Sequence, residues 1–331
     1  MDDSPSFSVK DEHDKMNALK REIASWQLRS RTLELGRRTL VMGIVNITPD
    51  SFSDGGRFFD QEAAVTHALQ LLDEGADLLD LGAESTRPGS RAGGAEGTAL
   101  APAVSTDEEQ ARLLPVLAGI LRERPHAVVS VDTYKAATAR AALAAGAEII
   151  NAVSGFLWDP EMAAVCADGG SGSPGVVLMH TRGRPEEWRT LPPLTSDAVL
   201  AEVNDGLAVS LAAAASVGIP ADAIVLDPGY GFGKRYGENF PLLARQAELL
   251  ELGRPLLVGV SRKSFLGRAL APLHGGSDAP STERETASVA ALVAAILHGA
   301  SIVRVHSVRP AVEAALVADA VLASEMIGTT P

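Results

Sequence analysis

The chain has 331 residues, enough for two ordinary domains or for one large α/β barrel. Apolar residues make up 46% and aromatic residues only 4%, which favours parallel strands covered by helices over an antiparallel sandwich. The formal net charge of −13 disfavours binding to nucleic acid or to an anionic membrane, so an anionic substrate needs a local cluster of Arg and Lys. The single cysteine, Cys166, excludes an intrachain disulfide and a multi-cysteine zinc site.

The first part of the chain has no regular pattern. Residues 1–25 are polar and acidic, unlike a signal peptide, and are expected to form a flexible extension. Arg31–Thr39 is expected to form a short hairpin that closes one end of the fold. Residues 26–331 are interpreted as one domain, and a cytoplasmic location is the default expectation.

From Leu40 onward one unit repeats: a short apolar run, a polar or glycine-rich loop, and an amphipathic stretch rich in Ala and Leu. This alternation predicts a parallel sheet, and eight repeats predict an α/β fold of one domain, the (β/α)8 TIM barrel. The eight apolar runs are Leu40–Val45, Leu78–Leu81, Ala127–Val131, Glu148–Ile150, Gly175–Met179, Ala223–Leu226, Pro255–Val260 and Ser301–Val305.

The stretches between the apolar runs carry helix signals. Apolar residues recur with helical spacing over Val65–Leu72, and Gly75 follows as a stop. Thr106 and Glu109 form a capping-box pattern for the next helix. The longest apolar stretch, Ala287–Val303, is interpreted as a buried helix followed by a strand rather than a membrane span. Further glycines end predicted helices just before an apolar run: Gly146, Gly218, Gly253 and Gly299.

Polar side chains follow every predicted strand, at the end of the barrel where such folds build their active sites. Loops ordinarily favour Gly, Ser and Pro, so a set of acids, amides and bases indicates a site that takes a group from each strand. In chain order the residues are Asn46; Glu84, Thr86 and Arg87; Asp132; Asn151; His180; Asp227; Ser261, Arg262 and Lys263; and Arg304 with His306.

Some of these residues also have plain structural interpretations. Asp132 and Asp227 each precede a turn and could cap a helix. His180 could be a core histidine with satisfied hydrogen bonds. The glycine-rich run after Asp227 lacks the spacing of a P-loop, so a phosphate loop is the weaker interpretation. Cys166 lies in an apolar run and is interpreted as a buried spacer rather than a nucleophile.

Four motifs stand at the strand ends: VNITPDSFSDGG (Val45–Gly56), ESTRPG (Glu84–Gly89), DPGYGFGK (Asp227–Lys234) and GVSRKS (Gly259–Ser264). Through these motifs, in this order, the chain resembles the dihydropteroate synthases over about residues 40–310. The first and third motifs are the most specific, and the ordered combination is hard to obtain by chance. The resemblance implies the same TIM barrel that the repeat predicts.

Members of this family join 6-hydroxymethyl-7,8-dihydropterin diphosphate to 4-aminobenzoate and release diphosphate. The resemblance implies this reaction, a Mg²⁺ cofactor, a homodimer and a target for sulfonamides. It also implies that the C–O bond to diphosphate breaks early, because the electron-rich pterin stabilises a methylene cation. The enzyme then has to stabilise the departing diphosphate and exclude water until the amine attacks.

The resemblance assigns a role to each matched position. Lys263, Arg304, His306 and Asp132 would carry the catalysis. The pterin would be held by Asp132, Asn151, Met179, Asp227, Gly231 and Lys263. The diphosphate would be held by Asn46, Thr86, Arg304 and His306, and the metal by Asn46 and Asp54. The aminobenzoate pocket would be lined by Phe52, Thr86, Arg87, Pro88, Phe232 and Ser261.

Three positions depart from the family's pattern. Ala152 stands where many relatives have Asp, and Arg182 lies in a Thr-Arg-Gly turn where Met and Lys are common. Ser307 replaces the Asp of a His-Asp-Val sequence. These changes bear on substrate affinity more than on the reaction.

Two other functions are compatible with many of these features. A barrel that transfers a methyl group from methyltetrahydrofolate to a corrinoid protein would share the Asp and Asn pterin contacts. It would not need a diphosphate site or the first two loop motifs. A catalytically silent pterin-binding paralogue would be expected to lose Asn46, Arg87, Lys263 or Arg304, and all four are present.

Overall fold

A computed structural model describes residues 21–47, 57–84, 104–168 and 172–327. Within them, eight parallel strands close into a barrel, each paired with the next along the chain and the last with the first. The predicted TIM barrel is confirmed, and all eight apolar runs form strands. The strands are β3 (Leu40–Asn46), β4 (Leu78–Gly82), β5 (Val129–Asp132), β6 (Ile149–Ala152), β7 (Gly175–Met179), β8 (Ile224–Asp227), β9 (Leu256–Val258) and β10 (Ala300–Val305).

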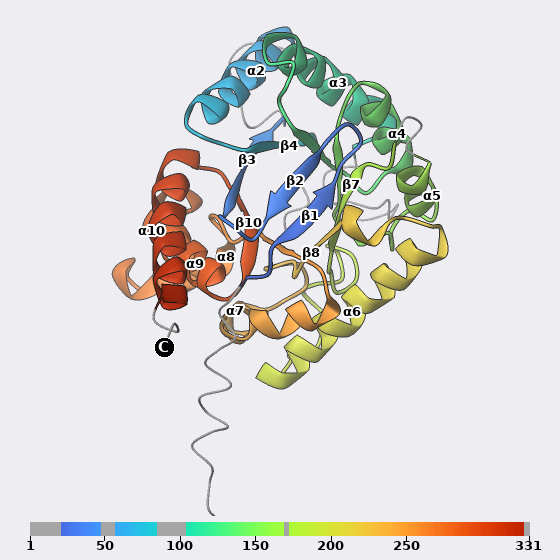
Figure 1. Ribbon diagram of the computed structural model, residues 1–331. Helices are drawn as coiled ribbons and strands as arrows, with labels where there is room; N and C mark the ends of the chain where they lie inside the picture. Colours follow the sequence, from blue (N-terminus) through green and yellow to red (C-terminus); the bar gives the residue numbers. More distant parts are fainter. Residues whose placement is uncertain (1–20, 48–56, 85–103, 169–171, 328–331) are drawn as a thin grey trace, which may run out of the picture.

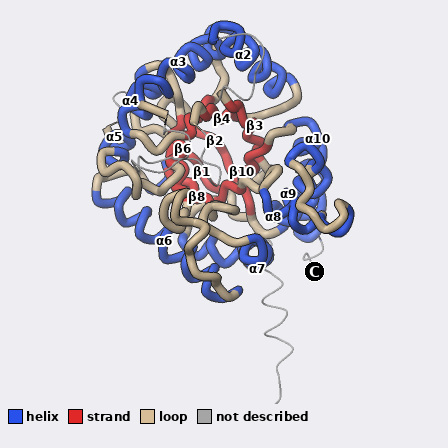
Figure 2. The backbone as a smooth tube through the Cα atoms, turned by 180° about the vertical axis from the view of Figure 1, so that it is seen from behind, coloured by secondary structure: helices blue, strands red, loops and turns tan. Residues whose placement is uncertain are grey.

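Helices form a ring around the barrel, which Figures 1 and 2 show from opposite ends. Their inner faces pack on the outward-facing strand residues in one large apolar core, rich in Val, Leu and Ala. The helices in the described part of the chain are α2 (Arg57–Asp73), α3 (Thr106–Glu123), α4 (Ala136–Ala144), α5 (Met162–Ala167), α6 (Ser196–Ser216), α7 (Asn239–Ala244), α8 (Ser264–Ala269), α9 (Glu285–Leu297) and α10 (Val308–Ile327).

The longest apolar stretch, Ala287–Val303, is a helix followed by a strand, as predicted. Gly299 turns the chain from α9 into β10 with a φ of +95°, a left-handed conformation that favours glycine. Among the described helices, α6 alone is long and apolar enough to cross a membrane. One face of α6, with Val199, Val203 and Leu207, is buried against the barrel.

The predicted capping box of α3 is wrong by one residue. The N-cap is Ser105, whose side chain accepts a hydrogen bond from the backbone N–H of Glu108 at 3.2 Å, and Thr106 is the first helical residue. Glu109 is buried and forms an ion pair with Lys135 at 3.0 Å. Because its carboxylate is paired with the Lys135 ammonium, Glu109 is not available to cap its own helix.

An antiparallel hairpin closes the end of the barrel at which the strands begin, and it crosses the front of the view in Figure 1. Its strands are β1 (Ala24–Gln27) and β2 (Thr32–Leu35). The prediction of a closing hairpin is confirmed, but its predicted position, Arg31–Thr39, is too late in the chain. Trp26 and Leu35 are fully buried among the first inward-facing residues of the barrel strands.

Contacts between the N-terminal segment and the barrel begin before residue 26. Arg21 donates to the Thr39 hydroxyl at 2.7 Å and to the carbonyl of Ala300 at 3.0 Å, and it forms an ion pair with Asp319 on α10. This one side chain ties the segment before the hairpin to the start of the barrel and to its last helix. The rest of the expected extension, residues 1–20, lies outside the described residues.

The barrel interior changes from apolar to polar along its axis. Residues two apart on a strand share a face, so successive inward side chains form layers. The layer next to the hairpin is apolar and consists of Met42, Leu78, Val128, Ile149, Val177, Val225, Leu257 and Ile302. Two residues further along the strands come Asp80, Ser130, Asn151, Asp227 and Arg304. The polar groups therefore rest on an apolar floor and face the end of the barrel seen in Figure 2.

Trp26→Ala is expected to lower the free energy of unfolding by about 3–5 kcal/mol, the usual cost of deleting a fully buried large side chain. The variant also loses the hydrogen bond from the indole Nε1 to the carbonyl of Ala223, which is 2.9 Å long. Urea denaturation followed by circular dichroism measures the change. Trp26→Phe keeps most of the volume without the donor and serves as the control. A loss below about 1 kcal/mol in Trp26→Ala would show that the hairpin does not stabilise the barrel.

Candidate active site

Four side chains from four strands meet at the polar end of the barrel. Arg304 on β10 donates from Nε to Asp80 at 2.6 Å and from Nη2 to Asp132 at 2.7 Å. The same Asp80 oxygen accepts from the Asn151 amide at 3.1 Å. The structure thus brings together three residues that the sequence predicted for the site, with Asp80 linking Arg304 to Asn151 and Arg304 linking Asp80 to Asp132.

Asp80 was missed because it lies within the apolar run Leu78–Leu81. It is completely buried, and its second oxygen, Oδ1, has no hydrogen-bond partner within the described structure. The Asn151 side-chain oxygen is also unpartnered there. A carboxylate in the middle of a buried parallel strand is rare enough to have been a signal. Two buried acceptors without donors favour a ligand that brings N–H groups.

The electrostatics of this cluster are set by its depth. Burial raises the pKa of Asp132 to about 7; the nearby Arg304 guanidinium opposes this rise and the Asp80 carboxylate adds to it. For Arg304, burial lowers the pKa, but the carboxylates of Asp80 and Asp132 outweigh it and hold the pKa above its ordinary value. Arg304 therefore stays charged, while Asp132 exchanges its proton near neutral pH.

The ends of β8 and β9 supply the opposite wall. Asp227 is buried, which raises its pKa, and it accepts a hydrogen bond from the backbone of Gly229 at 2.7 Å. The Lys263 ammonium lies 4.1 Å from the centre of the Phe232 ring. Gly231, with φ of +81°, lies beneath the Lys263 side chain. Asp227 acts here within its own turn, which leaves its remaining acceptor positions for a ligand.

His180 and Lys234 form a separate buried pair. Lys234 Nζ lies 2.9 Å from His180 Nδ1 and donates to the carbonyls of Gly229 and Phe232 at 2.8 and 3.3 Å. Burial lowers the pKa of both groups, that of Lys234 to about 7. His180 is therefore an interior histidine with a satisfied partner. Lys234 fixes the shape of the glycine-rich loop from inside and is not directed at a phosphate.

The last two strands are joined at their ends by Ser261 and His306. The Ser261 hydroxyl accepts from the backbone N–H of His306 at 3.2 Å and lies 3.0 Å from the ring nitrogen Nδ1. Met179 ends β7 and is buried, and Asn46 ends β3 with partial exposure. The sequence analysis placed each of these residues at a strand end, and that placement is confirmed.

The three departures from the family's pattern have distinct surroundings. Ala152 is buried in the apolar core. Arg182 donates to the carbonyls of Pro192 at 3.3 Å and Gly233 at 3.2 Å, so it supports the glycine-rich loop. The Ser307 hydroxyl accepts from Arg262 at 2.9 Å and donates to Glu285 at 2.9 Å. Arg182 and Ser307 are thus both integrated into local hydrogen-bond networks.

Five of the assigned residues lie outside the described part of the chain, namely Phe52, Asp54, Thr86, Arg87 and Pro88. Among the described residues, no group of three or more His, Cys, Asp and Glu side chains could hold a metal ion. Cys166 is fully buried, and burial raises the pKa of its thiol to about 12, which confirms a spacer rather than a nucleophile.

Comparison with known proteins agrees with this geometry. Residues 42–306 match the family described as pterin binding enzyme. The dihydropteroate synthase of Bacillus subtilis is 40% identical over 290 residues, which cover 88% of this chain and 91% of that protein. The Xanthomonas albilineans enzyme, solved with 4-aminobenzoic acid, aligns with a TM-score of 0.77 at 39% identity, covering 94% of this chain and 100% of that one. The Burkholderia cenocepacia enzyme, solved with 7,8-dihydropteroate, aligns at 0.74 with 39% identity, covering 92% and 99%.

The chain therefore belongs to the family of pterin-binding enzymes, and within it to the dihydropteroate synthases. It is a transferase of folate synthesis that condenses 6-hydroxymethyl-7,8-dihydropterin diphosphate with 4-aminobenzoate, giving dihydropteroate and diphosphate. The methyl-transferring barrel and the silent paralogue lose their support, because the relatives that match most of the chain are dihydropteroate synthases.

Asp80→Ala is expected to lower kcat/KM on the order of 100-fold, because it releases Arg304 and leaves buried donors unpaired. Asp80→Asn keeps an acceptor in place and removes only the charge, so it is expected to lose less. Steady-state kinetics measure both. In an Arg304→Ala background, Asp80→Ala should have little further effect, since the two residues act as a unit. Fully additive losses would contradict the link between them.

Proposed function

We propose that the pterin is held by Asp132, Asn151, Asp227 and Lys263, with Met179 and Gly231 beside its ring. The observation that carries this assignment is the set of buried acceptors at the polar end of the barrel, two of which have no donor among the described residues. A pterin ring edge presents several N–H groups, which match carboxylate and carboxamide oxygens. Lys263 supplies a donor for the acceptor atoms of the same ring.

The diphosphate is assigned to Arg304, His306, Asn46 and Thr86. The family resemblance assigned Arg304 to the diphosphate and not to the pterin. Its two hydrogen bonds to Asp80 and Asp132 argue against so strict a division. A guanidinium has five N–H donors, so Arg304 can keep both acids and still donate to a phosphate oxygen. We therefore assign Arg304 to the boundary between the two parts of the substrate.

The aminobenzoate is assigned to Phe232 and Ser261, together with Phe52, Thr86, Arg87 and Pro88. The Phe232 ring is held edge-to-face against Trp188 at 5.4 Å between centroids, with the Lys263 ammonium over its face. This arrangement supports a flat apolar wall for an aromatic amine. Sulfonamides are expected to compete for this wall, because they resemble the amine.

Mg²⁺ is proposed as the cofactor, held by Asn46 and Asp54 and by the substrate's phosphate oxygens. The carboxamide of Asn46, partly exposed at the end of β3, is a hard oxygen donor of the kind this ion prefers. Mg²⁺ commonly uses one or two protein ligands and keeps water or phosphate for the rest. When bound, it would neutralise charge on the departing diphosphate.

In this proposal the site residues bind and orient the substrates and stabilise the charge of the leaving group. Arg304 and His306 donate to the diphosphate and stabilise its growing charge as the C–O bond lengthens. Asp132, Asn151 and Asp227 orient the pterin by accepting its N–H donors. Neither a covalent nucleophile nor a strong base is required, because the amine attacks a methylene carbon that the pterin has already made electrophilic.

A homodimer in the cytoplasm is proposed for the working enzyme. Three exposed apolar side chains on α10, Leu316, Val317 and Val321, support a protein contact on this helix. The net charge of −13 supports an enzyme that neither nucleic acid nor an anionic membrane attracts. Light scattering coupled to size exclusion measures the oligomeric state directly.

The function is tested by mixing the pterin diphosphate, Mg²⁺ and 4-aminobenzoate and identifying dihydropteroate by mass. Diphosphate release should depend on the amine. Lys263→Ala is expected to cost about 2–4 kcal/mol of transition-state stabilisation, because it leaves a buried substrate acceptor unpaired. Arg309→Ala, which removes a largely exposed side chain of α10, is the matched control and should match the wild type. Activity within twofold of wild type in Lys263→Ala would contradict the pterin assignment.

The affinity for a free pterin is expected to rise between about pH 6 and pH 8. The pKa of Asp132 is raised to about 7, so the carboxylate that accepts the ring N–H groups forms only as the pH passes through this value. Binding at pH 6 should therefore release a proton, which isothermal titration in buffers of different ionisation enthalpy detects. Asp132→Asn should bind more weakly and without this pH dependence. A wild-type affinity that is constant over this range would contradict the assignment of Asp132.

A further inference from the structure

The turn between β9 and α8 carries an arginine at a position that favours glycine. The backbone N–H of Lys263 donates to the carbonyl of Val260 at 3.3 Å, which makes Arg262 the third residue of a four-residue turn. Its φ is +56°, and Phe156 is the only other non-glycine residue with a positive φ in the described structure. Gly or Asn adopts this conformation more readily, so an Arg here indicates that its side chain is required.

Side chains of α9 and the residue before it hold the backbone of Arg262 on both sides. The backbone N–H of Arg262 donates to the Ser288 hydroxyl at 2.8 Å, and its carbonyl accepts from Arg284 Nη1 at 2.9 Å. The Ser288 hydroxyl in turn donates to the carbonyl of Arg284 at 2.7 Å, and Arg284 Nε donates to the carbonyl of Ala279 at 2.8 Å. Arg262 is therefore held in its left-handed conformation by hydrogen bonds with side chains outside the turn.

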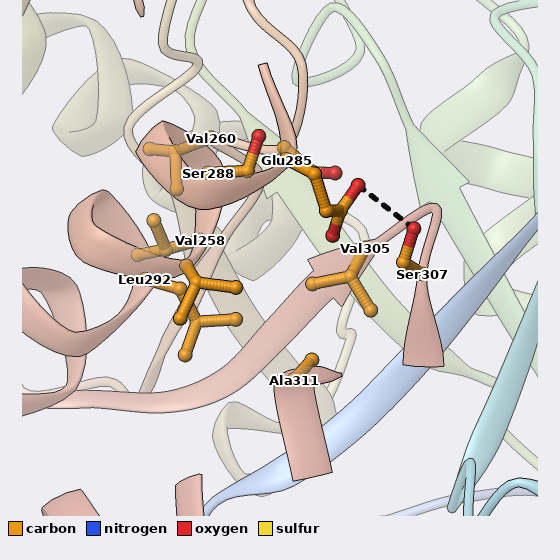
Figure 3. A pocket seen from close by; sticks show the side chains of 10 residues that line it. Val258, Val260, Glu285, Ser288, Leu292, Val305, Ser307 and Ala311 are labelled. Atoms are coloured by element: carbon orange, nitrogen blue, oxygen red, sulfur yellow. Dashed lines mark hydrogen bonds between the residues drawn. The ribbon is translucent and has the colours of Figure 1, made fainter. Parts of the chain in front are cut away.

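The guanidinium of Arg262 reaches across to the end of β10. Its Nη2 donates to the Ser307 hydroxyl at 2.9 Å and lies 3.4 Å from Glu285 Oε2. The Ser307 hydroxyl completes the bridge by donating to Glu285, and Figure 3 shows these two side chains directed toward each other beside a small cavity. The cavity lies among β9, β10, α9 and α10, and its lining combines apolar side chains such as Val258 and Val305 with the polar side chains of this bridge.

The two neighbours of Arg262 are both site residues. Ser261 accepts the hydrogen bond from the backbone N–H of His306, and Lys263 lies over the Phe232 ring. A change in the backbone of Arg262 must move one or both of them, because they are bonded directly to it. The bridge to Ser307 holds the residue after His306 from the other side.

We propose that Arg262 is a positioning residue that sets the spacing between the ends of β9 and β10. Its left-handed backbone directs Ser261 and Lys263, and its guanidinium, through Ser307 and Glu285, fixes His306 relative to them. In this chain Ser307 and Glu285 together do what a single carboxylate at position 307 could do alone. The inference rests on the roles proposed above for Ser261, Lys263 and His306.

The test compares Arg262→Gly with Arg262→Ala. Glycine removes the backbone strain as well as the guanidinium, whereas alanine keeps the strain. Arg262→Gly is expected to melt at or above the temperature of Arg262→Ala, yet both should lose at least tenfold in kcat/KM for the aminobenzoate. A glycine variant with wild-type kcat/KM would overturn the proposal, because the left-handed backbone alone would then suffice. Losses of activity that simply follow the losses in melting temperature would overturn it too.

Two milder variants keep the test valid if the turn fails to fold. Ser307→Ala and Glu285→Gln loosen the guanidinium without changing the turn, and each is expected to lower kcat/KM by about threefold to tenfold with less than a twofold change in the affinity for free pterin. Unchanged kinetics in both variants would overturn the proposal. Arg268→Ala, which removes an exposed ion pair with Asp278 near the same turn, is the matched control and should remain at wild-type activity.

These experiments distinguish a failure of the proposed function from a failure of the positioning role of Arg262. If the wild type and Arg268→Ala formed no dihydropteroate, the assignment of the reaction would be at fault. If both formed it and the Arg262 variants did so equally well, the reaction would stand and the positioning role would fall.

Discussion

The site depends on one interaction inside the barrel, the guanidinium of Arg304 held between Asp80 and Asp132. A charge at this depth is costly unless it is paired, and removing either partner leaves the other uncompensated. The three residues lie on β4, β5 and β10, so they meet only if the last strand closes onto the first. Barrel closure is thus a condition for the chemistry, and the paired charges in turn favour the closed register over alternatives.

The hairpin and the apolar layer protect this interaction from one side. Trp26 and the inward residues of the strand beginnings exclude water from beneath the ionic network. Within the described residues, the polar groups therefore face the opposite end of the barrel, which is where we propose that the substrates bind. The low dielectric at this depth strengthens the hydrogen bonds between Arg304 and its acids, and burial raises the pKa of Asp132 to about 7. The same burial stabilises the barrel and tunes the site.

The sequence predicted the architecture well because local signals and global fold agree in this chain. Eight apolar runs at regular spacing have few arrangements other than a barrel, and strand ends then fix which side chains share the rim. Asp80 was not predicted as a site residue, because a search for apolar runs gives no weight to a single acid inside a run. The left-handed backbone of Arg262 could not be read either, since only its partners on α9 make that conformation stable. The sequence pattern does not show which partner a side chain takes in the fold: Glu109, predicted to cap α3, pairs with Lys135, and Ser105 is the N-cap.

The balance of charge at the rim fits the chemistry proposed for it. Three carboxylates, those of Asp80, Asp132 and Asp227, face two cations, Arg304 and Lys263. If the substrate binds as proposed, the acids around the pterin favour positive charge on its methylene, and Arg304, at the boundary between the two parts, favours negative charge on the diphosphate. Burial raises the pKa of Asp132 to about 7, so this acid contributes its full negative charge only above neutral pH. In the proposed arrangement the carboxylates and Arg304 therefore favour the separation of charge that accompanies breaking of the C–O bond to diphosphate.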